Sequence, residues 1–227
     1  MKKYVIAIDG PAASGKSTTA KLLAKKLKYV YIDTGAMYRA CALETILKNI
    51  SLKDEKSLQI MLDSIRIDIL YSDKGNILLL NGDDVTKRIR EADITKLSSE
   101  IAVIGIVRTK MVDLQREIGK NGGVIMDGRD IGTVVFPQAD YKFFIVADVE
   151  VRAYRRWIEA KEKGEILILS DVEKELNWRD QNDSNREISP LKKADDALEI
   201  DTTNLSVTEQ VELIGKAIER GKNAEIL

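Results

Sequence analysis

The residues best suited to chemistry form one short stretch, Gly10-Pro-Ala-Ala-Ser-Gly-Lys-Ser17. It matches the phosphate-loop pattern G-x-x-x-x-G-K-[S/T] at every fixed position. Glycines in such a loop let the backbone wrap around an anion, and backbone N–H groups of the loop and of the following helix point at phosphate oxygens. Lys16 would neutralise the β- and γ-phosphates, and the Ser17 hydroxyl would be a ligand of Mg²⁺. The loop therefore predicts a site for a nucleoside triphosphate with Mg²⁺.

The segments on either side of this loop support that interpretation. Residues 4–8 are a short apolar run typical of a buried strand, and Ala20, Leu23, Ala24 and Leu27 recur at helical spacing. The alternative is a glycine-rich turn whose lysine matches the pattern by chance. A strand before the loop and a helix after it favour the phosphate loop. We expect Lys16 to be an exposed loop residue, and we expect the triphosphate to be bound by Gly10, Pro11, Ala12, Ala13, Ser14, Gly15, Lys16, Ser17 and Thr18.

Charged residues also follow two further predicted strands. Asp33-Thr-Gly-Ala-Met-Tyr-Arg39 follows a strand at 29–32, and Asp127-Gly-Arg-Asp130 follows a strand at 124–126. In an open parallel sheet, ligands bind beyond the carboxyl ends of the strands, so these segments and the phosphate loop would share one rim. Each charge could instead be an ordinary solvated loop residue. Their joint placement around a phosphate loop favours a binding site.

Three arginines, Arg152, Arg155 and Arg156, are spaced so that they share one helix face. They could form a solvated face in which Glu159 pairs with Arg155 or Arg156. They could instead belong to a mobile flap whose guanidinium groups meet phosphates during transfer. The sequence leaves both interpretations open.

A third charged cluster, Arg179-Asp180-Gln-Asn-Asp183-Ser-Asn-Arg186, alternates in sign. It could be a salt-bridge lattice on the surface. It could equally recognise a sugar diol through Asp183 and an anion or a base edge through its arginines.

Composition narrows the possible functions. With 36 basic and 37 acidic residues the net charge is −1, so no global field attracts nucleic acid or an anionic membrane. No apolar run approaches the ~20 residues of a membrane helix, and the first one is too short for a signal peptide. Cys41 is the single cysteine, which favours a cytoplasmic location. Histidine is absent, which excludes Ser-His triads, histidine bases and histidine-ligated metals.

The order of predicted elements indicates an α/β fold. Five strands, at 4–8, 29–32, 124–126, 142–146 and 197–200, would form a parallel sheet flanked by helices. Between them, alternation over 65–71, turn residues at 72–76 and a return strand at 77–80 predict an antiparallel hairpin outside that sheet. Helices are expected near 36–48, 58–65, 93–101, 107–118, 150–163 and 171–180, and a capping box at Ser206 and Glu209 begins the last one. We expect one domain over 1–227.

The segments IDGPAASGKST, DTGAMYR, VIMDGRDIGT and RDQNDSNR, in this order, resemble those of bacterial cytidylate kinases, a family of nucleoside monophosphate kinases. The resemblance covers essentially the whole chain. It implies a P-loop kinase core, a monophosphate-binding insertion with the hairpin at 37–105, and a helical lid at 150–186. The implied reaction transfers the γ-phosphoryl group of ATP to CMP, with dCMP as a second acceptor, in pyrimidine metabolism. A monomer that needs Mg²⁺ with ATP and binds neither nucleic acid nor membrane is implied as well.

The resemblance also implies roles for individual residues. Arg39 and Arg129 would hold the acceptor phosphate, and Lys16, Arg129, Arg152 and Arg156 would act in transfer. The remaining substrate contacts would come from Thr34, Ser99, Arg108, Asp130, Arg179, Asp183 and Arg186, with Ser99, Arg108 and Arg186 reading the pyrimidine and Arg179 and Asp183 the ribose. The sequence departs from the family at Asn182, where some members have an extra arginine, and at Gly105, where many have proline.

Three other classes of protein share part of this pattern. A switch GTPase normally has an N-K-x-D guanine reader, and no asparagine of this chain is followed by lysine. A kinase of another small molecule would explain the loop and the lid but has no use for the base-reading set. A nucleic-acid-binding ATPase is disfavoured by the net charge of −1.

Overall fold

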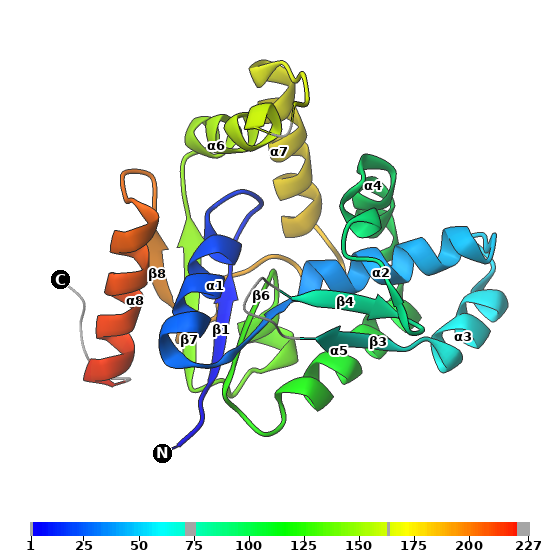
Figure 1. Ribbon diagram of the computed structural model, residues 1–227, viewed down its shortest axis with the longest axis horizontal. Coiled ribbons are helices and arrows are strands. Elements are labelled where there is room, and N and C mark those ends of the chain that lie inside the picture. Colours follow the sequence, from blue (N-terminus) through cyan, green and yellow to red (C-terminus); the bar gives the residue numbers. More distant parts are fainter. Residues whose placement is uncertain (1, 71–75, 163, 222–227) are drawn as a thin grey trace. The chain divides into compact units, whose positions relative to one another are not determined.

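The computed structural model describes residues 2–70, 76–162 and 164–221. The chain separates into two compact units. Unit 1 comprises residues 1–32 and 121–227, and unit 2 comprises residues 33–120. Each unit is built around its own sheet (Figure 1).

The sheet of unit 1 is the predicted five-stranded parallel sheet, with strand order β2-β6-β1-β7-β8. Its strands are β1 (Val5–Asp9), β2 (Val30–Asp33), β6 (Val124–Gly128), β7 (Tyr141–Val146) and β8 (Leu198–Asp201). In the centre, Ile6 of β1 lies opposite Ile125 of β6 and Tyr141 of β7. Ile6, Ala7 and Ile8 of β1 are fully buried because helices cover the strands, which explains the unbroken apolar run in its sequence.

The α-helices among the described residues of unit 1 are α1 (Lys16–Leu27), α6 (Val149–Glu162), α7 (Leu169–Ser184) and α8 (Val207–Arg220). Helices α1 and α8 pack side by side and share a core with the sheet, in which Leu23 and Ile214 are fully buried (Figure 1). The predicted capping box is present, because Ser206 Oγ accepts from Glu209 N and the Glu209 side chain accepts from Ser206 N. A single π-helical turn, η2 (Ile131–Val135), follows β6 and was not predicted.

Unit 2 holds the predicted hairpin. Strands β3 (Ile67–Leu70) and β4 (Ile77–Leu80) are antiparallel, and a two-residue strand β5 (Asp83–Asp84) adds a third member that the sequence pattern did not indicate. The expected strand residue Tyr71 and the turn residues 72–75 lie outside the described residues. The helices of unit 2 are α2 (Thr34–Leu47), α3 (Glu55–Ser64), α4 (Ala92–Ile101) and α5 (Gly105–Gly119), with a short 3-10 helix η1 (Arg88–Arg90).

A buried carboxylate fastens the three-stranded sheet to helix α2. Glu44 is 3% exposed, and its Oε1 accepts hydrogen bonds from Asn81 Nδ2 at 2.9 Å and from Lys48 Nζ at 3.1 Å. Asn81 Oδ1 in turn accepts from the backbone N–H of Arg66 at 2.9 Å. A buried charge needs such partners, so this network ties the return strand to α2.

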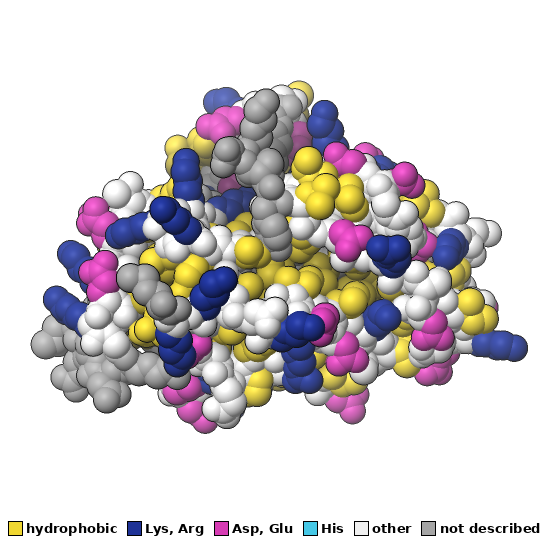
Figure 2. Space-filling model, turned by 60° about the horizontal axis from the view of Figure 1, so that its bottom comes forward, with side chains coloured by type: hydrophobic (Ala, Val, Ile, Leu, Met, Phe, Trp, Pro, Cys, Tyr) yellow, Lys and Arg dark blue, Asp and Glu magenta, His cyan; other side chains and the backbone are white. Residues whose placement is uncertain are grey.

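Most predicted helices agree with the structure to within a few residues, although α2 begins at Thr34 rather than 36 and α7 extends from Leu169 to Ser184. Lys163, the expected last residue of α6, lies outside the described residues. None of the described helices is both long and apolar enough to cross a membrane. On the face drawn in Figure 2, basic and acidic side chains are interspersed, as the net charge of −1 leads one to expect.

Candidate active site

The phosphate loop leaves β1 through a turn that only glycine fits. Gly10 has φ 149°, and a Cβ there would lie 2.1 Å from the carbonyl oxygen of Ile145 in β7. Gly15 has φ 94° and is the N-cap of α1, where no side chain caps the helix. The first turn of α1 contains no acidic residue, so its N-terminus presents backbone donors and a positive dipole end to an anion. Strand, loop and helix thus stand in the predicted relation.

Lys16 is buried, which corrects our expectation of an exposed lysine. It is 6% exposed, and its Nζ donates to the Pro11 carbonyl of its own loop at 2.9 Å. The side chain thus reaches back from the start of α1 to the beginning of its own loop. Burial lowers the pKa of Lys16 to about 7, and the nearby Arg129 acts in the same direction. Phosphate oxygens would reverse this effect, because an opposite charge favours the protonated amine.

Ser17 and Asp127 form a hydroxyl–carboxylate pair at the mouth of the loop. Ser17 Oγ donates to Asp127 Oδ2 at 2.6 Å, and Tyr31 of β2 donates from its hydroxyl to Asp127 Oδ1 at 2.7 Å. Mg²⁺ in nucleotide sites commonly takes one or two protein oxygens together with phosphate oxygens and water. Within the described part of the chain no cluster of three or more Asp, Glu, His or Cys side chains could hold a metal ion. The Ser17–Asp127 pair therefore fits a Mg²⁺ ion that arrives with the nucleotide.

Asp9, the last residue of β1, fixes the loop that follows β6. Its Oδ1 accepts from the backbone N–H of Ile131 at 2.8 Å, and its Oδ2 accepts from that of Gly132 at 2.7 Å. Burial raises the pKa of Asp9 to about 7, although these two N–H donors act in the opposite direction. Because Arg129 and Asp130 directly precede η2, this clamp sets where both residues stand relative to the phosphate loop.

Asp183 of α7 joins two arginines of unit 1. Its Oδ2 accepts from Arg129 Nε at 2.6 Å, and its Oδ1 pairs with Arg186 Nη2. The side chains of Asp183 and Arg186 are only 8% and 9% exposed, so the cluster is not the surface lattice of the first interpretation. Burial by itself would raise the pKa of Asp183, but Arg129 and Arg186 hold it below its usual value, with a smaller contribution from Arg179.

The three arginines of α6 differ in surroundings. Arg152 is 6% exposed and donates to the Ala12 carbonyl of the phosphate loop at 3.1 Å and to Asp180 Oδ2 at 2.6 Å. Arg155 donates to the carbonyl of Thr202 at 2.5 Å. Only Arg156 fits the solvated-face interpretation, because its side chain is 42% exposed and lies 3.6 Å from Glu159. The structure thus brings Arg152, and not Arg156, against the phosphate loop.

In unit 2, the N-terminus of α2 holds Arg39. Asp33 Oδ1 caps the helix by accepting from Ala36 N at 2.9 Å, and Asp33 Oδ2 pairs with Arg39 Nη2 at 3.0 Å. A Cβ on Gly35 would lie 3.1 Å from Asp33 Oδ1 and 3.2 Å from Arg39 Nη1, so glycine leaves room for this pair. Thr34, the first residue of the helix, is buried.

The predicted base-reading residues stand nearby in unit 2. Arg108 is 3% exposed, donates to the Ala102 carbonyl at 3.1 Å, and lies 5.7 Å from the centre of the Tyr38 ring. Tyr38, the ring that Arg108 faces, is the residue before Arg39 in α2. Ser99 is half-buried in α4. Gly105, the departure from the family pattern, is the first residue of α5.

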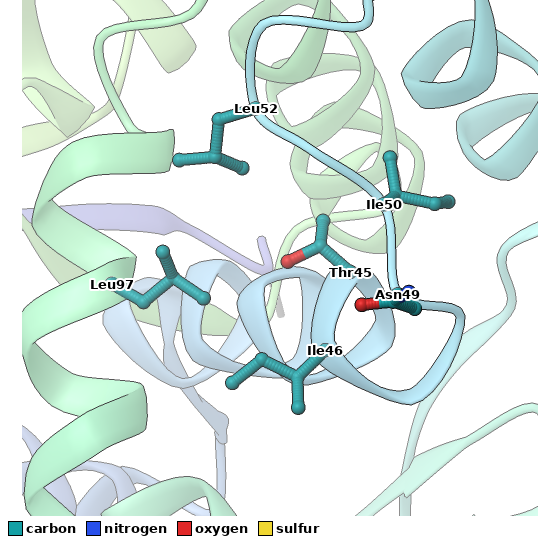
Figure 3. Close-up of a pocket in the computed structure, with 6 residues that line it drawn as sticks. All are labelled: Thr45, Ile46, Asn49, Ile50, Leu52 and Leu97. Carbon is teal, nitrogen blue, oxygen red and sulfur yellow. The ribbon is translucent and has the colours of Figure 1, made fainter.

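A small pocket in unit 2 is not a phosphate site. It encloses about 210 Å³ between the end of α2, the segment 49–52 and α4, and is lined by Thr45, Ile46, Asn49, Ile50, Leu52 and Leu97 (Figure 3). Its lining contains no charged side chain, and the Thr45 hydroxyl donates to the Ala42 carbonyl. It offers no cation to an anionic ligand.

Sequence reasoning missed Asp9, Tyr31 and Asp180 as supports of this site. Asp9 directly followed the strand predicted at 4–8, and Tyr31 fell inside the strand predicted at 29–32, where only the apolar period was considered. A charged residue at the carboxyl end of a buried strand is the signal that could have identified Asp9. Asp180 belonged to a cluster whose role stayed open, and its partner Arg152 is 28 positions away in the chain.

The family model described as cytidylate kinase matches residues 6–220 of this chain. The chain belongs to the cytidylate kinase family. A cytidylate kinase of Lactobacillus johnsonii is 49% identical over 215 residues, which cover 95% of this chain and 94% of that protein. A cytidylate kinase of a Geobacillus species is 51% identical over 209 residues, covering 92% and 93% of the two chains. These matches confirm the resemblance that the four sequence segments carried.

Among solved structures, the fold resembles that of a Thermus thermophilus protein. The TM-score is 0.50 at 15% identity, and the alignment covers 97% of this chain and 98% of the other. This likeness concerns the α/β fold alone, whereas the family assignment of this cytidylate kinase homologue comes from its sequence.

Proposed function

We propose that this protein transfers the γ-phosphoryl group of ATP to CMP, giving CDP and ADP, and that dCMP is a second acceptor. The observation that carries the proposal is the contact of Ser17 with Asp127 at the mouth of a phosphate loop, in a chain of the cytidylate kinase family. The loop supplies the triphosphate site, and the family supplies the acceptor.

The chemistry needs no general base. A phosphate oxygen of CMP forms a bond to the γ-phosphorus of ATP, while the bond from that phosphorus to the β,γ-bridging oxygen breaks and its electron pair leaves with ADP. The attacking oxygen is already ionised at neutral pH, so the absence of histidine costs nothing. Catalysis is then positioning and charge neutralisation.

Residues of unit 1 would supply most of that charge. Lys16 would lie against the β- and γ-phosphates, Ser17 and Asp127 would hold Mg²⁺, and Arg129 would face the transferring group once it exchanges part of its contact with Asp183. Mg²⁺, when bound, would neutralise charge on the β- and γ-phosphates. Arg152 is poised for the same task, because its guanidinium already donates to the loop carbonyl of Ala12. Arg156 would join only if it leaves Glu159.

The residues proposed for the acceptor follow from the family resemblance. We assign Thr34, Arg39, Ser99 and Arg108 of unit 2, with Arg129, Asp130, Arg179, Asp183 and Arg186 of unit 1, to CMP. Segment 37–105 would be the monophosphate-binding region and segment 150–186 the lid. We further propose action as a monomer in the cytoplasm.

Product analysis tests the proposal. The protein is incubated with Mg·ATP and, in separate reactions, CMP, dCMP, UMP, AMP and GMP, and the nucleotides are separated chromatographically. We expect equal amounts of CDP and ADP with CMP, and dCDP with dCMP. ADP without CDP would contradict the proposal, because water or another acceptor would then receive the phosphoryl group.

A further inference from the structure

Gln210 of α8 is a polar side chain in the core of unit 1. It is 1% exposed and stands next to Val211 in a helix whose Ile214 is fully buried. An amide at such a position costs stability unless its polar atoms are paired. Both polar atoms of this amide do have partners, one in the first turn of α1 and one in the segment between β8 and α8.

The carbonyl of Gln210 faces the first turn of α1. Its Oε1 accepts from the hydroxyl of Thr19 at 2.6 Å, and Thr19 is itself fully buried. Thr19 closes that first turn, since its N–H donates to the carbonyl of Gly15 at 3.0 Å. A Cβ at Gly15 would come within 3.0 Å of Gln210 Oε1, so the glycine of the loop and the glutamine are in direct contact.

The amide nitrogen of Gln210 faces the other way, toward the segment between β8 and α8. Its Nε2 donates to the carbonyl of Leu205 at 3.1 Å. The same segment meets the phosphate loop at its other end, because Thr202 Oγ1 donates to the carbonyl of Ser14 at 2.9 Å. The segment 202–205 is therefore bonded to the phosphate loop directly through Thr202 and to the first turn of α1 through Gln210.

We propose that Gln210 is a positioning residue for the nucleotide: it fixes the first turn of α1 and Gly15 so that their N–H groups point at the phosphates of ATP. This inference rests on the proposed use of the loop as an ATP site. Gln210 lies on the core side of α1, where Thr19 is buried while Thr18 is exposed, so it acts through the loop. A glutamine that served the core alone would affect stability and leave nucleotide affinity unchanged.

The test replaces Gln210 by methionine, which has a similar shape and lacks both hydrogen bonds. Dissociation constants for ATP and ADP are measured by calorimetry with the full chain, at a temperature where every variant is folded. We expect Gln210→Met to weaken the binding of ATP and of ADP by about tenfold. The Thr19 hydroxyl and the Leu205 carbonyl would lose their buried hydrogen-bond partner, and the loop would shift. We expect the KM for CMP to change by less than about twofold, because Gln210 contacts no residue assigned to the acceptor alone.

Two further variants sharpen the result. Thr19→Val removes the partner hydroxyl and keeps the shape of the side chain, so it should weaken ATP binding to a similar extent. In the double variant with Gln210→Met, it should cause little further loss of ATP affinity. Gln115→Met is the matched control: Gln115 is also 1% exposed, but lies in α5 of unit 2, and its Nε2 has no hydrogen-bond partner among the described residues. We expect it to leave ATP affinity unchanged.

Wild-type ATP affinity in folded Gln210→Met, or equal weakening of ATP and CMP, would overturn the inference. If Gln210→Met does not fold, Thr19→Val decides in the same way. A wild-type protein that binds ATP but does not phosphorylate CMP would overturn the proposed function and still leave the role of Gln210 measurable through its ATP affinity.

Discussion

The hydroxyl of Ser17 and the carboxylate of Asp127 lie 2.6 Å apart, although 110 positions separate them in the chain. The two residues come from the phosphate loop and from the end of β6, so the parallel pairing of β1 with β6 creates this contact. The second oxygen of Asp127 is held by Tyr31, which fixes the orientation of the carboxylate.

The first prediction concerns this pair. Asp127→Asn keeps the size of the side chain but removes the negative charge, and we expect kcat to fall by about 10²-fold and the Mg²⁺ concentration for half-maximal activity to rise. Tyr31→Phe, which removes only the orienting hydroxyl, should cost about tenfold or less. Steady-state rates at varied Mg²⁺, with EDTA as the metal-free limit, measure both. Unchanged Mg²⁺ dependence in Asp127→Asn would show that the carboxylate does not serve the metal.

The second prediction concerns Lys16→Met. We expect a loss of at least about 10²-fold in kcat, because one preorganised positive charge is removed. We also expect the nucleotide-free variant to be more stable than the wild type at pH 7. Burial lowers the pKa of Lys16 from 10.5 to about 7, so the unfolded chain binds the extra proton between these values and the wild-type free energy of unfolding rises with pH there. In Lys16→Met, the free energy of unfolding should not show this rise with pH.

Thermal unfolding from pH 6 to pH 10 checks the stability part of this prediction. Lys142→Met is a matched control, because Lys142 is also buried but pairs with Asp196 at 2.7 Å and with the Pro137 carbonyl at 2.7 Å. That variant should be less stable than the wild type. A Lys16→Met protein with normal turnover would contradict the role of the loop.

The third prediction concerns Asp183, whose carboxylate compensates Arg129 and Arg186. Asp183→Asn should lower the free energy of unfolding by about 3 kcal/mol at pH 7, since two largely buried cations lose their partner. Because the pKa of Asp183 is lowered in the folded state, its stabilisation is present above pH 3.8 and is lost as the pH falls through the folded value. The free energy of unfolding, measured with denaturant, should therefore differ less between pH 7 and pH 3 in the variant than in the wild type.

An exposed pair provides the comparison. Asp171→Asn breaks a contact with Lys174 in which both side chains are more than half exposed, and should cost less than about 1 kcal/mol. Equal losses in the two variants would show that the Asp183 cluster contributes no more than a surface ion pair.

The fourth prediction concerns the proposed lid at 150–186. Hydrogen exchange of the described parts of α6 and α7 should slow when ATP and CMP bind together, because the arginines of α6 would then contact phosphates. Helix α3, which carries no proposed site residue, should exchange at the same rate in both states. Identical exchange of α6 and α7 with and without nucleotides would count against a closing lid.

The sequence predicted the parts of this site that depend on local pattern. The phosphate loop was recognisable because strand, loop and helix are consecutive, and Asp127 was expected near the loop because the carboxyl ends of parallel strands meet at one edge of a sheet. The burial of Lys16 was not predicted, because a motif does not report that the loop folds over its own lysine. Strand β5 was not predicted, because its two residues are too few to show the alternation of apolar and polar side chains typical of a strand.

The supporting contacts required the tertiary structure. Asp9 meets Ile131 and Gly132 more than 120 positions away, and Thr19 meets Gln210 across 191 positions. No local pattern distinguishes these side chains from other polar residues near the ends of strands and helices. Their roles follow only from which elements the sheet and helices α1 and α8 bring together.

The ratio of kcat/KM for CMP to that for UMP, measured with Mg·ATP, tests the central proposal most directly. Arginine only donates hydrogen bonds, so Arg108 or Arg186 facing the N3 acceptor of cytosine would meet an N–H in uracil. One or two unpaired buried groups at about 1–3 kcal/mol each predict an advantage for CMP of roughly 10- to 10⁴-fold. Arg108→Ala should reduce this ratio and leave ATP binding largely intact. A wild-type protein that used UMP or AMP as well as CMP would contradict the account.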